Sequence, residues 1–329
     1  MKKVNVAVVG ATGMVGRKML QVLEERDFPI ENLYMFSSKK SAGQKIVYCG
    51  KEYTVEELTE TSFDRGIDIA LFSAGGSTSL QFAPIAASKG TVVIDNSSAW
   101  RMDESVPLVV PEVNPEDINW NKGIIANPNC STIQAVVALK PLHNSYGIKR
   151  IVYSTYQSVS GAGVSGYSDL ENGYKGDAPK KFLYPIAGNC LPHIDSFLEN
   201  GYTKEEMKMV NETKKILHDD SLRITATTVR VPVFYSHSES INVELNKDFS
   251  VNEVKELLRR SPGIVLQDDP ENNQYPTPLY TADKDEVYVG RIRRDESLDY
   301  GLNMWVVADN IRKGAATNAV QIAQLLLNR

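Results

Sequence analysis

The sequence predicts an α/β protein, with a doubly wound, Rossmann-type first domain and an α+β second domain. Two patterns lead to this prediction. In residues 1 to about 127, short apolar segments alternate with helical segments, as they do around a parallel sheet. From about residue 148 the chain changes to longer segments in which polar and apolar side chains alternate, which suggests a second sheet.

The first domain begins with a strand, a glycine-rich turn and a helix. Val4 to Val9 read as a buried strand, and the segment 10–16 (GATGMVG) leads into an amphipathic segment that runs to Glu25. Glycines allow a tight turn and close approach of the backbone to a pyrophosphate, whose charge then lies at the helix N-terminus. The spacing is GxxGxxG and not GxGxxG, so the order of strand, turn and helix indicates a dinucleotide site more strongly than the glycine spacing does. An ordinary turn between a strand and a helix is the alternative.

The second strand, Leu33 to Phe36, ends in the segment 37–41 (SSKKS). An NAD enzyme usually carries Asp or Glu at this place to bind the ribose hydroxyls. Hydroxyls and lysines suit a 2′-phosphate instead, so the segment favours NADP over the alternative of a solvated, charged loop. Further strands of this domain are expected near residues 67, 91 and 107.

Cys130 is the most informative single residue. It lies where the loop 126–129 (ANPN) meets the apolar run Ile133 to Leu139, which places a thiol at the N-terminus of a predicted helix. The unpaired N–H groups and the helix dipole stabilise a thiolate there. Cys130 is therefore a candidate nucleophile, although an arbitrary intracellular Cys is more often a small buried apolar residue.

The second domain supplies a candidate acid/base. Arg230 to His237 reads as a short strand that leads to a histidine, although a lone His is more often structural than catalytic. Other strands are expected at Ile148 to Ser158, Ile224 to Val233, Ser240 to Leu245, Val287 to Arg293 and Asn303 to Ala308. A thiol nucleophile, a dinucleotide site and an acid/base together describe an aldehyde dehydrogenase that works through a thioester.

Along essentially its whole length, the chain resembles the bacterial aspartate-β-semialdehyde dehydrogenases. Several motifs in the expected order are more specific than any one of them. These motifs are GATGMVG (10–16), DNSSAWRM (95–102), NPNCST (127–132), STYQSVSGAG (154–163), PIA (185–187), EEMK (205–208), RVPVFYSH (230–237) and DNIRKGAATN (309–318).

The resemblance implies a reaction and its catalytic residues. Cys130 would attack the acyl carbon of β-aspartyl phosphate, expel phosphate and form a thioester, which NADPH would reduce to aspartate β-semialdehyde. His237 would be the general acid/base, and Gln157 would hold the substrate near the thiol. The product would serve the biosynthesis of lysine and diaminopimelate, threonine and methionine.

The resemblance also implies how the substrate is bound. Arg230 would clamp the α-carboxylate, for which guanidinium geometry is suited, and Glu205 would bind the ammonium group. Lys208 and Arg101 would bind the phosphate. Glu205 and Lys208 are three apart in a predicted helix from Lys204 to Leu217, and a surface ion pair fits that spacing equally well.

The cofactor contacts implied by the resemblance fall into three groups. They are Thr12, Gly13, Met14 and Val15 at the pyrophosphate; Ser38, Lys40 and Ser41 near the 2′-phosphate; and Ser160, Gly161 and Asn310 around the nicotinamide.

The last segment, Gly314 to Leu327, has a helical apolar stripe and by resemblance packs back on the nucleotide domain. The expected domains are therefore 1–127 with 311–329 for NADP binding and 128–310 for catalysis and dimerisation, in a homodimer.

Composition agrees with this interpretation. The 329 residues, 42% of them hydrophobic, suggest two domains. A net charge of −5 does not indicate nucleic-acid binding, which is typical of proteins with an excess of positive charge. No run reaches the ~18 apolar residues of a membrane span, and the start of the chain leads straight into a strand, so a cytoplasmic protein is expected. Three cysteines without CxxC spacing argue against disulfides and a structural metal site.

Two kinds of alternative remain open. N-acetyl-γ-glutamyl-phosphate reductase and glyceraldehyde-3-phosphate dehydrogenase share the same thioester chemistry, and a substrate panel would separate them. A catalytically inactive, NADP-binding homologue is the second alternative, although Cys130, Gln157, Arg230 and His237 are all present.

Overall fold

The computed structural model describes residues 3–327, and the chain divides into two compact units. The first unit holds the chain up to Pro128 and from Ala315 onward, and the second holds Asn129–Gly314. The chain thus returns to the first unit between residues 314 and 315, slightly later than the 310/311 boundary that the sequence predicted.

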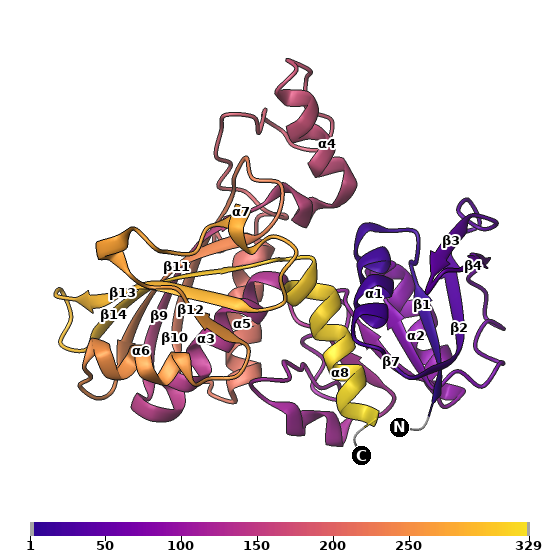
Figure 1. The fold of residues 1–329 in the computed structure, drawn as a ribbon, viewed down its shortest axis with the longest axis horizontal. Coiled ribbons are helices and arrows are strands. Elements are labelled where there is room, and N and C mark those ends of the chain that lie inside the picture. Colours follow the sequence, from indigo (N-terminus) through magenta and orange to yellow (C-terminus); the bar gives the residue numbers. More distant parts are fainter. Residues whose placement is uncertain (1–2, 328–329) are drawn as a thin grey trace. The chain divides into compact units, whose positions relative to one another are not determined.

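The first unit is built on a sheet with the strand order β5-β2-β1-β6-β7-β8, and its strand pairs are parallel. In chain order this is 3-2-1-4-5-6, the order of the dinucleotide-binding Rossmann fold, so the predicted fold class is confirmed (Figure 1). The strands are β1 (Val4–Val9), β2 (Ile30–Ser37), β5 (Glu56–Glu57), β6 (Ile69–Phe72), β7 (Val92–Asp95) and β8 (Ile124–Ala126). An antiparallel hairpin of β3 (Lys45–Tyr48) and β4 (Lys51–Thr54) is inserted after β2.

The helices of the first unit bury apolar stripes against this sheet. α1 (Met14–Glu25) buries Met19 and Leu23, and it contacts α8 (Thr317–Leu327), which buries Ile322. α2 (Gly76–Ser88) packs on β7 and β8, and a 3-10 helix, η1 (Pro115–Trp120), contacts α8. β1 is almost wholly buried, as expected for a parallel strand covered on both faces.

The strand predicted near residue 107 is not formed. Leu108 makes only an isolated parallel bridge to Ala126. Pro107 and Pro111 flank this bridge and have no amide hydrogen to continue a ladder. β8 takes the edge position of the sheet instead.

The second unit is built on a mixed sheet with the order β10-β9-β11-β14-β13-β12. β9 pairs parallel with β10 and antiparallel with β11. The strands are β9 (Ile148–Gln157), β10 (Arg223–Arg230), β11 (His237–Leu245), β12 (Ile264–Leu266), β13 (Val287–Asp295) and β14 (Gly301–Ala308).

The segment Arg230 to His237 is not one strand, as the sequence suggested. β10 ends at Arg230 and β11 begins at His237, and the chain between them turns. Pro232 cannot donate to a ladder, and Ser236 has a left-handed φ of 69°. The turn brings the ends of two strands of one sheet to the same edge.

Helices cover one face of the second sheet. α3 (Cys130–Tyr146) contacts β9, β11, β13 and β14; α5 (Lys204–Leu217) packs on β10; and α6 (Val251–Arg259) packs on β12 and β13. α4 (Gly163–Gly173) follows the short η2 (Val159–Ala162) and stands away from the sheet (Figure 1). The remaining short elements are η3 (Pro270–Asn272), α7 (Pro278–Thr281) and a π-helix, η4 (Arg312–Ala316).

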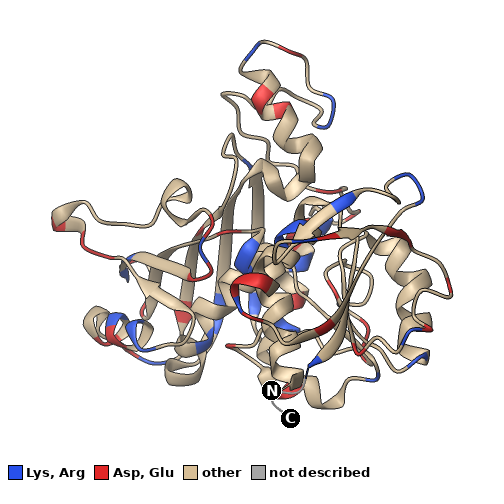
Figure 2. Ribbon diagram, turned by 45° about the vertical axis from the view of Figure 1, so that its right-hand side comes forward, with Lys and Arg blue, Asp and Glu red and all other residues tan. Residues whose placement is uncertain are grey.

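Charges of both signs are spread over both units, and Lys and Arg intermingle with Asp and Glu along the ribbon (Figure 2). Within residues 3–327, no helix combines the length and the apolar character needed to cross a membrane.

Candidate active site

Cys130 is the first residue of α3, the position at which the sequence predicted a helix to begin. Asn129 caps this helix, because its Oδ1 accepts the N–H groups of Ser131 at 3.0 Å and Thr132 at 3.4 Å. A Cβ atom on Gly314 would lie 2.9 Å from the Cβ of Cys130, so only glycine fits against the nucleophile. The thiol is thus held at a helix N-terminus, in a partly exposed position.

Three candidate side chains form one row across the end of the second sheet. Arg230 pairs with Gln157 in the register of β10 and β9. Ser238 pairs with Tyr156 across β11 and β9, which places His237 beside Gln157 at the next position. Residues of this row project from the buried, helix-covered face, because alternate residues along a strand share a face. We call Arg230, Gln157 and His237 the catalytic row.

Glu205 joins the catalytic row to the loop that carries the nucleophile. Its Oε1 accepts from Gln157 Nε2 at 3.1 Å and from Asn129 Nδ2 at 2.9 Å, and its Oε2 accepts from Lys208 Nζ at 3.0 Å. Burial raises the pKa of Glu205, but Lys208, Asn129 and Gln157 outweigh it and hold that pKa below its ordinary value. With Glu205 only 5% exposed, the pair with Lys208 is not the surface ion pair that its spacing also allowed.

Lys208 bridges two carboxylates. Its Nζ contacts Glu205 at 3.0 Å and Asp195 at 2.9 Å. Burial lowers the pKa of Lys208, yet the two carboxylates raise it overall, so the ammonium group stays charged.

Arg230 is 4% exposed, and its Nη1 donates to the carbonyl of Ser158 at 2.7 Å. Its Nε has no hydrogen-bond partner among residues 3–327. Burial lowers the pKa of Arg230, while Glu205 and Cys130 favour the charged form. A guanidinium has five donors, so Arg230 retains donors for an anionic group at this site.

His237 is fully buried next to this cation. Its Nδ1 accepts the backbone N–H of Ser158 at 3.0 Å, and the Ser158 Oγ lies 3.1 Å from the same atom. Burial, reinforced by Arg230, lowers the pKa of His237 to about 3, so the imidazole is neutral at neutral pH. A Cβ on Gly161 would lie 3.2 Å from His237 Nε2 and 2.8 Å from Arg230 Nη1, so this glycine lies against both groups.

Asn310 ties the loops around His237 together. Its Oδ1 accepts from Ser158 Oγ at 3.0 Å, Ser160 Oγ at 3.2 Å and the Ser236 N–H at 3.0 Å. Its Nδ2 donates to Ser160 Oγ at 3.1 Å. Ser160, Gly161 and Asn310, predicted to lie near a nicotinamide, therefore belong to the second unit and surround His237.

Sequence reasoning missed two residues of this site, Asn129 and Ser158. Asn129 carries a readable signal, since Asn directly before an apolar helical run is a typical N-cap. Ser158 carries none, because its contact with His237 joins residues that are far apart in the sequence.

The glycine turn of the first unit has the shape of a pyrophosphate cradle. Gly10 has a φ of +86°, and a Cβ there would lie 2.4 Å from the carbonyl oxygen of Ser73; a Cβ on Gly16 would lie 2.2 Å from the Gly10 oxygen. Gly13 is the N-cap of α1 and offers no side chain to its first amides, and the first turn has no acidic residue. The Gly13 N–H is bonded to the Gly10 carbonyl at 3.0 Å, whereas Met14 and Val15 contribute N–H groups of the first helical turn, which have no partner within a helix.

The predicted 2′-phosphate residues follow the end of β2. Ser38 and Lys40 are exposed and Ser41 is partly exposed. The Oγ of Ser37 lies 2.9 Å from Thr12 Oγ1, so this turn is linked to the glycine turn. The hydroxyls and lysine therefore lie at the same edge of the sheet as the cradle.

Arg101, the second predicted phosphate ligand, belongs to the first unit. It is 7% exposed, and its Nε and Nη2 donate to the carbonyls of Asn127 and Asn96, each at 2.9 Å. Its guanidinium thus supports the loops before α3 and after β7.

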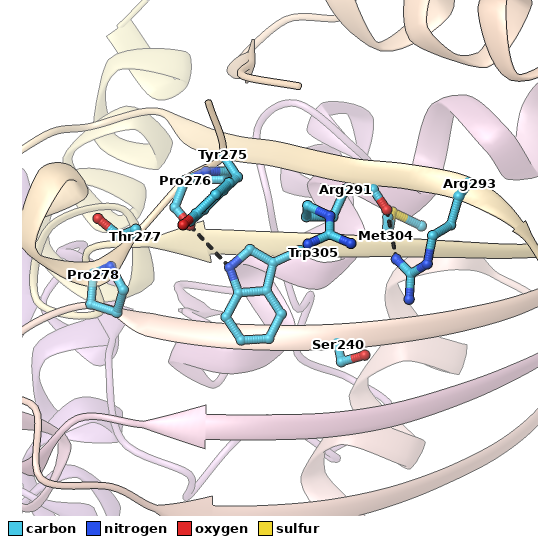
Figure 3. A pocket seen from close by; sticks show the side chains of 9 residues that line it. All are labelled: Ser240, Tyr275, Pro276, Thr277, Pro278, Arg291, Arg293, Met304 and Trp305. Atoms are coloured by element: carbon cyan, nitrogen blue, oxygen red, sulfur yellow. Dashed lines mark hydrogen bonds between the residues drawn. The ribbon is translucent and has the colours of Figure 1, made fainter. Parts of the chain in front are cut away.

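A separate pocket of about 320 Å³ lies on the other face of the second sheet (Figure 3). Ser240 and Trp305, which are register partners, form part of its wall together with Tyr275, Arg291 and Arg293. Ser240 lies between Glu239 and Ile241 on β11, so its side chain points away from the face that bears His237. The pocket is therefore distinct from the catalytic row.

Two family models match the chain, one on each unit. Residues 5–121 match the semialdehyde dehydrogenase NAD binding domain, and residues 139–313 match the semialdehyde dehydrogenase dimerisation domain. Aspartate-semialdehyde dehydrogenase of Aquifex aeolicus is 60% identical, covering 98% of this chain and 97% of its own. That of Bacillus subtilis is 50% identical over the same shares of the two chains.

Solved structures agree with these relatives. Aspartate semialdehyde dehydrogenase II of Vibrio cholerae, complexed with ASA, is 50% identical with a TM-score of 0.96, covering 100% of this chain and 99% of its own. The Candida albicans enzyme with NADP is 27% identical with a TM-score of 0.80 and 99% coverage of both chains. With identities of this size over nearly its full length, the chain belongs to the aspartate-semialdehyde dehydrogenase family.

Proposed function

We propose that this oxidoreductase is an NADP-dependent, phosphorylating aspartate-semialdehyde dehydrogenase that acts through a thioester on Cys130. The observation that carries the proposal is the position of Cys130 at the start of α3, near the hydrogen-bonded pair of Gln157 and Glu205 and within the electrostatic reach of Arg230. The Vibrio cholerae relative with ASA and the Candida albicans relative with NADP support the substrate and the cofactor.

Substrate binding follows from the charges at the site. Arg230 retains donors for the α-carboxylate, and a planar guanidinium can bind it through two hydrogen bonds. Glu205 remains ionised, which suits an ammonium group, and charged Lys208 at its side suits the phosphate. Arg101 is assigned to the phosphate with less support, because two of its nitrogens already serve backbone carbonyls.

The chemistry begins with attack of the Cys130 thiolate on the acyl carbon. The C–S bond forms, the C–O bond to phosphate breaks, and phosphate leaves. When bound, NADPH supplies the hydride that reduces the thioester carbon. Gln157 and Arg230 hold the substrate, His237 is the general acid/base beside the reacting carbonyl, and collapse of the oxyanion breaks the C–S bond and releases the semialdehyde.

The cofactor assignment rests on the first unit. Thr12, Gly13, Met14 and Val15 would hold the pyrophosphate, and Ser38, Lys40 and Ser41 would hold the 2′-phosphate. Ser160, Gly161 and Asn310 would approach the nicotinamide, with the carboxamide of Asn310 already engaged by Ser160. The first unit would thus bind NADP and the second would carry out catalysis.

We also propose a homodimer formed through the open face of the second sheet. This face carries Tyr156, which is 40% exposed and packs on Trp305 with ring centroids 5.4 Å apart, and the pocket of Figure 3. The match of residues 139–313 to a dimerisation domain supports a dimer formed through the second unit. The product would serve lysine and diaminopimelate, threonine and methionine biosynthesis.

A substrate panel tests the proposed function. We expect NADP reduction with aspartate semialdehyde that depends on inorganic phosphate, and much weaker reduction with NAD, N-acetylglutamate semialdehyde or glyceraldehyde 3-phosphate. Activity with another aldehyde alone would overturn the roles of Glu205, Lys208 and Arg230. NADPH binding without turnover on any aldehyde would favour a catalytically inactive homologue.

A further inference from the structure

Helix α5 carries a second buried carboxyl group, Glu212, which lies outside the EEMK motif. Its side chain is 1% exposed. Glu212 follows Glu205 by seven residues and Met209 by three, so the three side chains lie on one face of α5. The helix face that bears Glu205 therefore bears another carboxyl group, which no step of the proposed reaction uses.

Glu212 binds the residue directly before the nucleophile. Its Oε2 accepts the backbone N–H of Asn129 at 2.7 Å, and both residues are buried. Three residues earlier on α5, the Met209 Sδ accepts the hydroxyl of Thr132 at 3.7 Å. Thr132 lies in the first turn of α3, so α5 contacts the chain on both sides of Cys130.

Asn129 is held at three points, and Glu212 holds its backbone amide. The side-chain Nδ2 donates to Glu205 at 2.9 Å, and the side-chain Oδ1 caps α3. Because a peptide bond is planar, a hydrogen bond to the backbone N–H fixes the orientation of the whole peptide plane before Asn129. Glu212 thus acts on the path of the chain, whereas Glu205 contacts a side chain that can rotate.

The Asn129 N–H cannot obtain a partner from α3 itself. It is one of the N–H groups at the start of a helix, where the preceding turn that would supply a carbonyl is missing. A buried N–H that loses its acceptor is costly, so without Glu212 the loop would shift to find another one. The shift would be passed directly to Cys130, the next residue.

We propose that Glu212 is a positioning residue for the nucleophile. By accepting the Asn129 N–H, it fixes where Cys130 enters α3 and so holds the thiol at its distance from the acyl carbon. The inference rests on the proposed function and adds to it a residue that contacts neither substrate nor cofactor. A displacement of about 1 Å can cost about 10²-fold in rate, so kcat is sensitive to this hydrogen bond.

Three substitutions separate the reach of the Glu212 side chain from its charge. Glu212→Gln keeps an oxygen at the same reach and removes the acid. Glu212→Asp keeps the carboxyl group but is one methylene shorter, and Glu212→Ala removes the acceptor. Thr213→Val is the matched control, because Thr213 is the next residue, is fully buried and has its Oγ1 3.0 Å from the hydroxyl of Tyr153 on β9.

Hydrogen exchange of the full-length protein, followed by mass spectrometry, measures the loop without substrate. In Glu212→Ala and Glu212→Asp, the amides of residues 129–132 should exchange faster than in wild type, while the rest of the second unit keeps its wild-type exchange. Glu212→Gln and Thr213→Val should leave the exchange of residues 129–132 unchanged. If Glu212→Asp kept the protection and Glu212→Gln lost it, or if exchange rose throughout the unit, the proposal would be wrong. The comparison of Asp with Gln decides even if Glu212→Ala does not fold.

Steady-state kinetics with aspartate semialdehyde, NADP and phosphate give the second readout. Glu212→Ala and Glu212→Asp should lower kcat about 10- to 100-fold, with a much smaller change in KM because Glu212 does not contact the substrate. Glu212→Gln should restore most of the rate, and Thr213→Val should keep it. Equal loss of kcat in Glu212→Asp and Thr213→Val would indicate a general packing effect and contradict the positioning role. Absence of turnover in the wild type would overturn the proposed function and leave the exchange result valid.

Discussion

Glu239 is a carboxyl group buried inside the second unit. It pairs with Thr155 in the register of β11 and β9, and Thr155 pairs with Thr228 on β10, so the three form a polar row next to the catalytic row. Glu239 is 0% exposed, and neither of its carboxyl oxygens has a partner within residues 3–327. Burial raises its pKa well above the ordinary value of a glutamate, which favours the protonated, neutral carboxyl.

This protonated carboxyl predicts how stability depends on pH. The pKa of Glu239 is higher in the folded state than in the unfolded state. Such a group contributes its full stability at pH values below its unfolded-state pKa. That contribution is lost as the pH rises from the unfolded-state pKa to the folded-state pKa. Relative to wild type, Glu239→Gln should therefore gain about 1.4 kcal/mol of unfolding free energy per pH unit within that window. Urea denaturation of both proteins between mildly acidic and neutral pH measures this. Parallel stability profiles would show that Glu239 is not protonated by burial.

Some of these residue-scale properties could be predicted from the sequence and others could not. The position of Cys130 followed from the loop 126–129 directly before the apolar run Ile133 to Leu139, a local signal. The neutral state of His237 and the burial of Glu239 depend on which strands become neighbours and on which helices cover them. Those contacts join α3, β9 and β11 across the chain, and local patterns do not encode them.

At the scale of elements, caps fix where the functional helices begin. α5 has a capping box in which Thr203 accepts the Glu206 N–H at 3.2 Å and Glu206 accepts the Thr203 N–H at 2.7 Å. α6 has the same motif with Ser250 and Glu253. The two helices have the same capping motif, but only α5 carries Glu205 and Lys208. The cap of α6 is therefore a control for the cap of α5.

We expect Thr203→Ala and Ser250→Ala each to lower the unfolding free energy by about 1 kcal/mol, the usual value of an N-cap side chain. Thr203→Ala should in addition raise the KM for aspartate semialdehyde, because it loosens the first turn that holds Glu205. Ser250→Ala should leave that KM unchanged. Denaturation and steady-state kinetics on both variants check this, and a KM effect of Ser250→Ala would contradict it.

Element prediction failed where proline or turn geometry interrupted an apolar run. The run at 108–110 lies between Pro107 and Pro111 and forms a single bridge instead of a strand. The segment from Arg230 to His237 reads as one strand but is the end of β10, a turn and the start of β11. In the second case the turn is what brings Arg230 and His237 into the catalytic row.

At the scale of the whole molecule, the two faces of the second sheet carry different groups of side chains. The helix-covered face of the second sheet carries the catalytic row, and its open face carries Trp305 and the pocket with Arg291 and Arg293. The alternation of side chains along β11 and β14 separates the two. This division was foreseen from the sequence only as a sheet used for catalysis and association.

The open face gives a prediction about assembly. Arg293→Glu reverses a charge on this face. Because both subunits of a two-fold dimer contribute the same surface, the interface would contain the reversed charge twice. The variant should therefore shift from dimer toward monomer in sedimentation experiments. Arg260→Glu makes the same reversal after α6, on the helix-covered side, where the Arg260 side chain is 81% exposed. It should leave the dimer intact. Equal behaviour of the two variants would contradict the assigned interface.

The central claim is that Cys130 forms a thioester, and rapid mixing tests it most directly. Aspartate semialdehyde and NADP are mixed with the enzyme in the absence of phosphate, NADPH is followed by absorbance, and the acid-quenched protein is analysed by mass spectrometry. The account predicts a burst of one NADPH per subunit with one acyl group on Cys130, release of that group when phosphate is added, and neither burst nor adduct in Cys130→Ala, which still binds NADPH. NADPH formation without an adduct, or a burst that survives in Cys130→Ala, would contradict it.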